Sequence, residues 1–201
     1  MLIQTTSQHT QLNLWGIFLI AIIGGSTWSC SRQAALNRIQ NLPAYDERGI
    51  NAIVIWPAGT TAEQVPKSWK QLLPIELLHS WPAPANLCIV ASTHQPNQAP
   101  ILMWLIDEAR PAGKAISAQP IAGMVFKVQN QTIRLIVATP TDAQHTLPTD
   151  WPTLQVRHPA FLDFWKSWLF MAMPLGTVSQ IEWRPPEWCT NLVQRYGQTP
   201  Q

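Results

Sequence analysis

The residues with the best spacing for chemistry lie around Cys88, near the end of an apolar run. Ser92, Thr93 and His94 follow this cysteine closely along the chain. A thiol or hydroxyl beside an imidazole suits nucleophilic catalysis, and ligands gather at the carboxyl ends of strands in open α/β sheets. Cys88 itself lies inside the run, so we expect a buried thiol without nucleophilic activity.

The other side chains that could bind a metal or transfer protons are widely spaced. Four histidines follow residue 50 at intervals of 15, 51 and 13 residues: His79, His94, His145 and His158. None has the close spacing by which one element places two imidazoles on one metal. Asp107 and Glu108 are adjacent, so on a strand they would face opposite ways and form no carboxylate pair. We therefore predict no metal site and no cofactor.

Short catalytic motifs are missing from the sequence. It contains no GxSxG, GxxxxGK, HExxH or CxxC pattern. These patterns mark the α/β-hydrolase nucleophile, the phosphate-binding P-loop, the zinc metalloproteases and the thioredoxin-type redox pair. The sequence therefore predicts no catalytic residues, and we expect a protein that is not an enzyme.

Charge is sparse and scattered. Charged residues make up 12% of the chain, with 13 Lys and Arg against 11 Asp and Glu. About 25% is usual for globular proteins. The Lys and Arg residues do not cluster into a basic stretch that could bind a phosphate backbone, so we exclude a nucleic-acid partner.

The N-terminal stretch Leu14 to Cys30 is apolar or uncharged throughout. Its length suits a transmembrane helix, while its strongly apolar part is short enough for a signal peptide. Cys30 follows the run and is a candidate for lipidation, although Trp28 is bulky for a lipoprotein cleavage site. Arginines follow the run and none precedes it, which favours a cytoplasmic domain, whereas the low-charge composition favours an extracytoplasmic one.

Cys88 and Cys189 are a candidate disulfide. Closing a loop of this length would add about 4–5 kcal/mol to stability in the chain-entropy model. In a reducing compartment both residues would be buried thiols.

The chain divides into four segments. We expect a hydrophobic anchor at 1–30, a linker helix and turn at 31–49, one globular domain at 50–190 and a flexible tail at 191–201. Eighteen prolines interrupt the chain, so helices should be short.

Within the domain, apolar runs predict strands at 50–57, 86–92 and 101–106. A helix over 60–78, divided by Pro66 and Pro74, would join the first two strands into a right-handed βαβ unit. Alternation over 123–139 predicts an antiparallel hairpin with its tip at Asn130 and Gln131. The expected fold class is α/β or α+β: a small mixed sheet, made of the βαβ unit and the hairpin, with short helices. This domain would follow an N-terminal transmembrane or signal-like helix along the chain.

The segment 159–173 is the strongest helix of the domain, because Pro159 suits the first helical position and Pro174 ends it. Its apolar surface extends most of the way around the helix, so it is either central in the core or a contact surface. The candidate interaction helix presents five residues: Phe161, Phe164, Trp165, Trp168 and Leu169.

These observations predict a membrane-anchored, non-enzymatic accessory or structural subunit of a cell-envelope assembly. Its membrane contact would be residues 14–30, with further protein partners. The domain would be extracytoplasmic rather than cytoplasmic. The alternative is an extracytoplasmic module that binds a small molecule or glycan in a tryptophan-lined groove, since aromatic faces stack on sugar rings. Candidates for the groove are Trp56, Trp69, Trp81, Trp104 and Trp151.

Overall fold

The computed structural model describes residues 34, 37–72, 81–93, 100–128, 131–142, 151–174 and 177–197. The strands are β1 (Tyr45–Asp46), β2 (Gly49–Trp56), β3 (Asn86–Val90), β4 (Leu102–Leu105), β5 (Ala115–Val128), β6 (Gln131–Pro140) and β7 (Val178–Arg184). The helices are η1 (Ala62–Gln64), α2 (Lys67–Lys70), α3 (Trp151–Arg157), α4 (Pro159–Ala172) and α5 (Pro186–Tyr196). The predicted mixed α/β class with short helices is confirmed.

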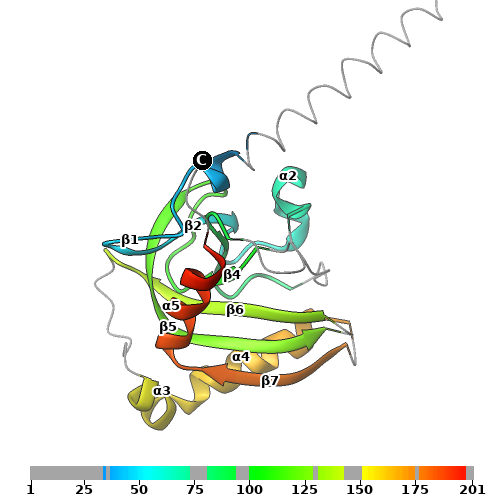
Figure 1. The fold of residues 1–201 in the computed structure, drawn as a ribbon. Helices are drawn as coiled ribbons and strands as arrows, with labels where there is room; N and C mark the ends of the chain where they lie inside the picture. The colour runs from blue at the N-terminus through cyan, green and yellow to red at the C-terminus, as the bar shows by residue number, and fades with distance from the viewer. Residues whose placement is uncertain are drawn as a thin grey trace, which may run out of the picture.

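The strands form one sheet in the order β1-β2-β3-β4-β6-β5-β7, and β2 also pairs with β5. That additional pairing closes β2, β3, β4, β6 and β5 into a barrel, whose curvature is visible in Figure 1. Closure removes exposed strand edges from the central strands. Strands β1 and β7 lie outside the ring, at the two ends of the sheet order.

The predicted βαβ unit is wrong. Strands β2 and β3 are antiparallel, with Ala52 opposite Val90. Between them, the described residues form η1 and α2, of three and four residues, in place of a long crossover helix. A parallel pair needs a long crossover connection, whereas an antiparallel pair does not. The one parallel pair in the described sheet is β4 with β6.

Strands β2, β3 and β4 are buried along their whole length. Their sequences are almost continuously apolar, which is the pattern of strands covered on both faces. The polar exception in β2 is Asn51, whose side-chain nitrogen donates hydrogen bonds to the Pro43 carbonyl at 3.2 Å and to an Asp46 carboxylate oxygen at 3.0 Å. The buried amide is therefore satisfied by the segment that leads into the sheet.

The predicted antiparallel hairpin is confirmed as β5 and β6, with Val128 opposite Gln131. Strand β5 begins at Ala115, eight residues earlier than the predicted strand. The early part contains Pro120, which has no N–H to donate to a neighbouring strand. The register shifts between Pro120 and Ala122, and such an irregularity is where a strand accommodates proline.

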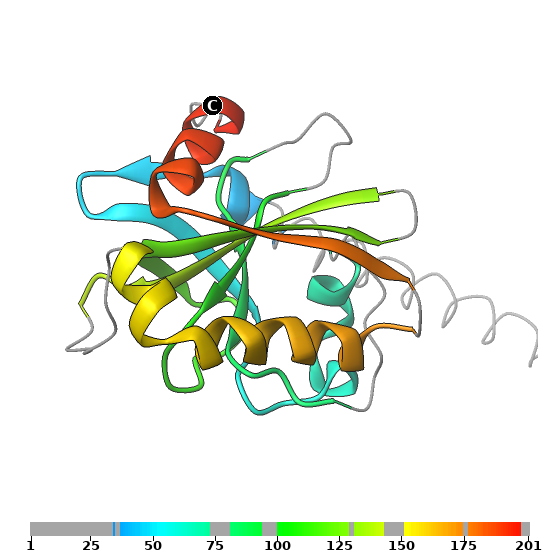
Figure 2. The ribbon, with the colours of Figure 1, turned by 90° about the horizontal axis from the view of Figure 1, so that it is seen from below.

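The helices cover the two faces of the sheet. Figure 2 shows α5 on one side and α4 on the other. The predicted helix from Pro159 is confirmed as α4, which buries Leu162, Trp165, Trp168, Leu169 and Ala172. We call its side of the sheet the α4 face and the opposite side the α5 face.

Helix α5 was not predicted. Pro186 lies in the first turn of the helix. Proline is favourable there because a backbone N–H at that position would have no acceptor inside the helix, so its absence costs nothing. The helix continues to Tyr196, so residues 191–196, expected in a tail, form its last turns. It buries Cys189, Leu192 and Val193 against the α5 face.

Helix α5 approaches β5 closely at Gly123. A β-carbon at this position would lie 2.6 Å from the Trp188 ring and 2.9 Å from the Cys189 sulfur. Glycine is therefore required here because any side chain would collide with the helix.

No helix in the described part of the chain is long and apolar enough to cross a membrane.

We expect Gly123→Ala to lower the free energy of unfolding by about 1–3 kcal/mol, because the added methyl group overpacks this contact. Urea unfolding measures the loss. In a Trp188→Ala background, which removes the ring, the same substitution should cost less. An equal cost in both backgrounds would show that the ring is not what the methyl group meets.

Candidate functional site

The nucleophile candidates near Cys88 are engaged in the structure. Cys88 is fully buried, and Ser92 and Thr93 are buried as well. The Ser92 hydroxyl lies 2.7 Å from the Leu42 carbonyl and 3.0 Å from the Gln40 carbonyl, at the end of the entering segment. Thr93 donates to the Val90 carbonyl at 2.9 Å. These groups therefore support the backbone, and His94 lies outside the described residues.

Ser92 has a positive φ of 45°, which is uncommon for a residue with a side chain. Its backbone N–H donates to the Ile39 carbonyl at 3.0 Å, and its hydroxyl binds the Gln40 carbonyl. Both groups therefore bind carbonyl oxygens at the end of the helical turn at 37–40. Carbonyls at a helix end need such partners. The strain at Ser92 thus has a structural explanation.

Cys88 and Cys189 are both free thiols and both buried. Burial raises the pKa of each thiol above its ordinary value, and for Cys189 the nearby Glu187 carboxylate adds to the shift. A raised pKa leaves little thiolate near neutral pH, so neither residue is a nucleophile.

The carboxylates after β4 are held by Arg110. The Arg110 Nε lies 2.6 Å from an Asp107 oxygen, and an Arg110 terminal nitrogen lies 3.8 Å from a Glu108 oxygen. The ion pair with Asp107 raises the pKa of the Arg110 guanidinium. The Asn86 oxygen accepts from the Arg110 and Ala58 backbone N–H groups at 2.8 and 3.1 Å. This cluster therefore ties the loops after β2 and β4 to β3.

No group of three or more His, Cys, Asp or Glu side chains within the described ranges could hold a metal ion. The acidic residues are distributed over separate elements, and several pair with an arginine nearby in the sequence, such as Asp46 with Arg48 at 3.2 Å. Carboxylate oxygens are the ligands that Mg²⁺ and Ca²⁺ prefer. The donor set described by the structure does not fit a divalent metal centre.

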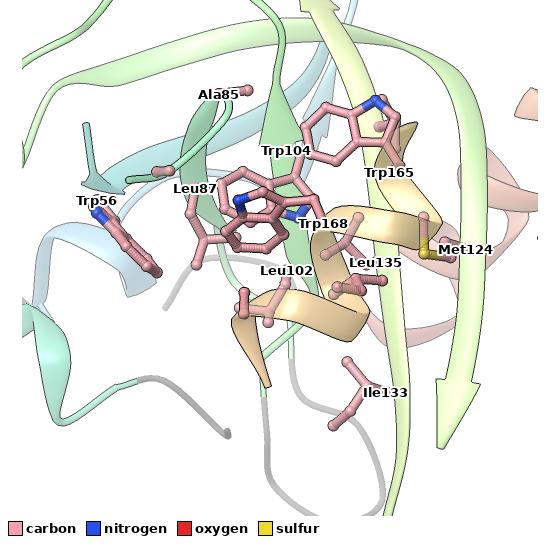
Figure 3. Packing of buried hydrophobic residues seen from close by; sticks show 14 of the residues in the cluster. Trp56, Ala85, Leu87, Leu102, Trp104, Met124, Ile133, Leu135, Trp165 and Trp168 are labelled. Atoms are coloured by element: carbon pink, nitrogen blue, oxygen red, sulfur yellow. The ribbon is translucent and has the colours of Figure 1, made fainter. Parts of the chain in front are cut away.

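The α4 face holds a tryptophan cluster made of Trp56, Trp104, Trp165 and Trp168. The centroid of the Trp104 ring is 6.3 Å from that of Trp56, 5.5 Å from that of Trp165 and 5.2 Å from that of Trp168. Figure 3 shows the rings between the sheet and α4, with Leu102 and Leu135 beside them. Tilted and edge-to-face pairs of this kind add about 0.5–1.5 kcal/mol each beyond area burial.

The four indole N–H groups of the cluster differ in their partners. Trp56 donates to the Thr60 carbonyl at 2.8 Å, and Trp168 donates to the Pro82 carbonyl at 3.2 Å. The N–H groups of Trp104 and Trp165 are buried and have no hydrogen-bond acceptor among the described residues. The cluster is therefore a packed core with two unsatisfied donors.

Three of the five tryptophans predicted to line a ligand-binding groove are buried in the core, so their rings cannot stack on a ligand. Trp56, Trp69 and Trp104 are buried, Trp151 is partly buried, and Trp81 is 42% exposed. Of the candidate interaction residues on α4, Trp165, Trp168 and Leu169 lie in the core and Phe161 is half-buried. Phe164 is 50% exposed.

The α5 face carries cationic side chains on three neighbouring strands. Arg134 of β6 lies opposite Val125 of β5, and Arg184 of β7 lies opposite Gly123. Lys127 is two residues beyond Val125, so it shares that face, and its side chain is exposed. We call Lys127, Arg134 and Arg184 the basic face. Glu182 of β7 also lies opposite Val125 and pairs with Arg184.

Sequence reasoning did not select the basic face as a site. Within the stretch 123–139, whose alternation predicted the hairpin, Lys127 and Arg134 alternate with apolar residues. Because Arg184 belongs to a strand that the sequence did not predict, its position beside the other two cations came from the structure.

No family model and no curated protein matches the sequence of this chain. Its fold, however, is similar to solved inorganic pyrophosphatases. The enzyme from Neisseria gonorrhoeae is 18% identical with a TM-score of 0.55, and the match covers 79% of this chain and 95% of that one. The enzyme from Helicobacter pylori is 13% identical with a TM-score of 0.59, covering 77% and 95%. A type I enzyme from P. falciparum is 10% identical with a TM-score of 0.62, covering 77% and 60%.

At these identities the likeness shows the fold alone, and the chain has the fold of inorganic pyrophosphatases. This finding contradicts the prediction of a non-enzymatic accessory subunit in a cell-envelope assembly, because the structures that share the fold are enzymes. The expectation that the chain is not an enzyme was drawn from missing short motifs. Active sites assembled from distant residues carry no such motif.

The predicted location, a domain anchored to a membrane and facing the outside, is contradicted by the same comparison. Residues 14–30 and Cys30, on which the membrane contact and lipidation were argued, lie outside the described residues. Protein partners and the exclusion of nucleic acid remain predictions.

We expect Trp56→Phe to cost about 0.5–1.5 kcal/mol more in unfolding free energy than Trp104→Phe. Both substitutions remove a similar volume, but the first also removes a hydrogen bond to the Thr60 carbonyl, which keeps only the Ala83 backbone N–H at 2.9 Å, while the second removes an N–H that has no partner among the described residues. Urea unfolding followed by circular dichroism measures the two losses. A Trp104→Phe loss as large as that of Trp56→Phe would mean that the Trp104 N–H has an acceptor in solution.

In a Cys30→Ser variant, Cys88 and Cys189 should react with a thiol reagent such as DTNB very slowly at pH 8, because burial raises their pKa and blocks access. Both should react at once in 8 M urea. Rapid reaction of the native protein would contradict the burial. A failure to react in urea until reductant is added would show that the two sulfurs form a disulfide.

Proposed function

We propose that this protein is a hydrolase that cleaves a phosphoanhydride bond. The observation that supports the proposal is the likeness in fold to inorganic pyrophosphatases, which extends over 95% of the Neisseria gonorrhoeae chain. The match also covers 79% of this chain, so it is a likeness of the whole fold and not of a single element. The same fold can host different reactions, so the activity itself has to be tested.

In the proposed reaction, a water oxygen forms a bond to phosphorus while the bond from that phosphorus to the bridging oxygen breaks. The water gives up a proton, and the leaving phosphate takes one up. Negative charge is spread over the transferred group and the leaving oxygen in the transition state, so catalysis depends on positive charge placed around them.

A protein can supply that charge in two ways. One is a divalent cation held by carboxylates, and the other is a set of arginine and lysine side chains. The described donor set does not fit the first, because no three carboxylate, imidazole or thiol groups converge in those residues.

The full-length purified protein should release phosphate from inorganic pyrophosphate, with two phosphates formed per pyrophosphate consumed. Phosphate release is followed with a colorimetric assay, and a nucleoside triphosphate and p-nitrophenyl phosphate are assayed in parallel. Each substrate is tested once with Mg²⁺ and once with EDTA.

The control is a mock preparation from cells that lack the chain, which reveals a contaminating host enzyme. Activity belonging to this protein should follow it through a final size-exclusion column. If none of the three substrates yields phosphate above the mock preparation under either condition, the proposed function is wrong.

A further inference from the structure

We infer that two copies of this protein associate through the outer side of α4, with their two α4 helices antiparallel across a twofold axis. This contact surface is independent of the proposed function. Three observations support it: the exposed apolar side chains on and beside α4, their spacing along the helix, and the position of the two charges of α4.

Exposed apolar side chains gather on and beside α4, which Figure 2 shows on the outside of the sheet. Six large apolar side chains are exposed in the described residues, and three of them belong to α4: Phe164 at 50%, Phe170 at 52% and Met171 at 44%. Val156 of α3 is a fourth. Trp81 is a fifth, and the carbonyl of the next residue, Pro82, accepts a hydrogen bond from the Trp168 indole of α4 at 3.2 Å. Exposed apolar side chains gathered in this way mark a contact surface.

The outer side of α4 carries four exposed residues at intervals of four, three and four: Ala160, Phe164, Ser167 and Met171. We call them the α4 stripe. They are distinct from the residues that α4 buries on the sheet. Residues three and four apart lie above one another on a helix, and alternation of these two intervals is the spacing of the seam between two helices packed side by side. The stripe therefore has the pattern of a helix that packs on a second helix.

The α4 stripe is complementary to itself when one helix is reversed, because bulky and small residues alternate along it. In an antiparallel pair centred between Phe164 and Ser167, Phe164 of each copy faces Ser167 of the other. Met171 of each copy likewise faces Ala160. Bulky side chains then fill the space beside small ones, identically on both copies, as a twofold axis requires. A parallel pair would instead place bulky residues against bulky ones.

The charges of α4 fit the same arrangement. Its two charged residues are Asp163 and Lys166, and no ion pair within the described residues involves either of them. Each precedes a member of the stripe by one residue, so both lie on the same flank of it. In the antiparallel pair this flank meets the same flank of the second copy. Asp163 is then about 3 Å along the axis from Lys166 of the other copy, within reach of the lysine side chain.

The contact is small. Helix α4 has 14 residues, so it is about 21 Å long. A standard interface buries about 800 Å² on each partner, and one helix with its neighbours supplies less than most. We therefore expect a dimer with a dissociation constant of about micromolar magnitude, which separates on dilution.

Sedimentation velocity of the full-length protein, over about a hundredfold range of concentration, measures the association by mass action. The dimer should dominate at the highest concentration. Phe164→Glu should weaken it by at least about tenfold, because a carboxylate enters the apolar centre of the contact on both copies. The matched control is Tyr45→Glu, which changes an aromatic residue of 47% exposure on β1 and should leave the dimer unchanged. Circular dichroism verifies that each variant is folded.

Charge reversal tests the proposed pairing across the contact. Asp163→Lys and Lys166→Glu should each weaken the dimer by about two- to fivefold, as expected for an exposed ion pair. The two substitutions together should restore the affinity, because opposite charges meet again. An affinity that falls further in the double variant would show that the two residues do not meet.

Disulfide cross-linking tests the direction of the helices. Ala160→Cys and Met171→Cys are prepared as separate variants in a Cys30→Ser background and oxidised with copper phenanthroline. Facing Cα atoms of two packed helices lie about 5 Å apart, within the range that a disulfide spans. The two variants should cross-link when they are mixed, and neither should cross-link alone. Cross-linking of Ala160→Cys to itself would indicate a parallel pair and overturn the antiparallel arrangement.

Three other results would overturn the inference. The first is a monomer at every concentration, and the second is an equal effect of Phe164→Glu and Tyr45→Glu. The third concerns the apolar N-terminal run, tested with Leu19→Glu. If that substitution dissociates the dimer and Phe164→Glu does not, the run is the contact and α4 is not. Phosphate release decides only the proposed function, so the two proposals fail separately.

Discussion

The pairing of β5 with three other strands is the constraint on which the remaining structure depends. Its first residues pair with β2, most of its length pairs with β6, and its second half also pairs with β7. The first of these pairings closes the barrel, and the last extends the sheet beyond it. Because both helical layers pack on this sheet, a change in the register of β5 would exchange the residues that face α4 with those that face α5.

The two faces of the sheet consequently have different chemistry. The α4 face is filled by aromatic and aliphatic side chains, and the tryptophan cluster joins β2 and β4 to the helix. The α5 face is covered by α5 around Gly123 and carries charged side chains farther along β5. In this chain the fold therefore places an apolar layer on one face of the sheet and charged side chains on the other.

Several elements could be predicted from the sequence, because their signals are local. The apolar runs gave β2, β3 and β4, the alternation around residue 130 gave the hairpin, and Pro159 gave the start of α4. Other elements were missed for local reasons as well. Pro120 concealed the first half of β5, and residues from 191 onward, predicted to be a tail, contain the last turns of the helix that begins at Pro186.

The sequence by itself determined which segments are apolar enough to be buried and that the acidic residues are few and dispersed. It also determined that Lys127 and Arg134 alternate with apolar side chains, since strand periodicity is a property of neighbouring residues. The tertiary structure decided that β2 and β3 run antiparallel, that Trp104 is in the core, and that Arg184 lies on the face of the other two cations. These outcomes depend on hydrogen bonds and packing between residues far apart in the chain, and the local pattern of side chains does not specify which distant strands will pair.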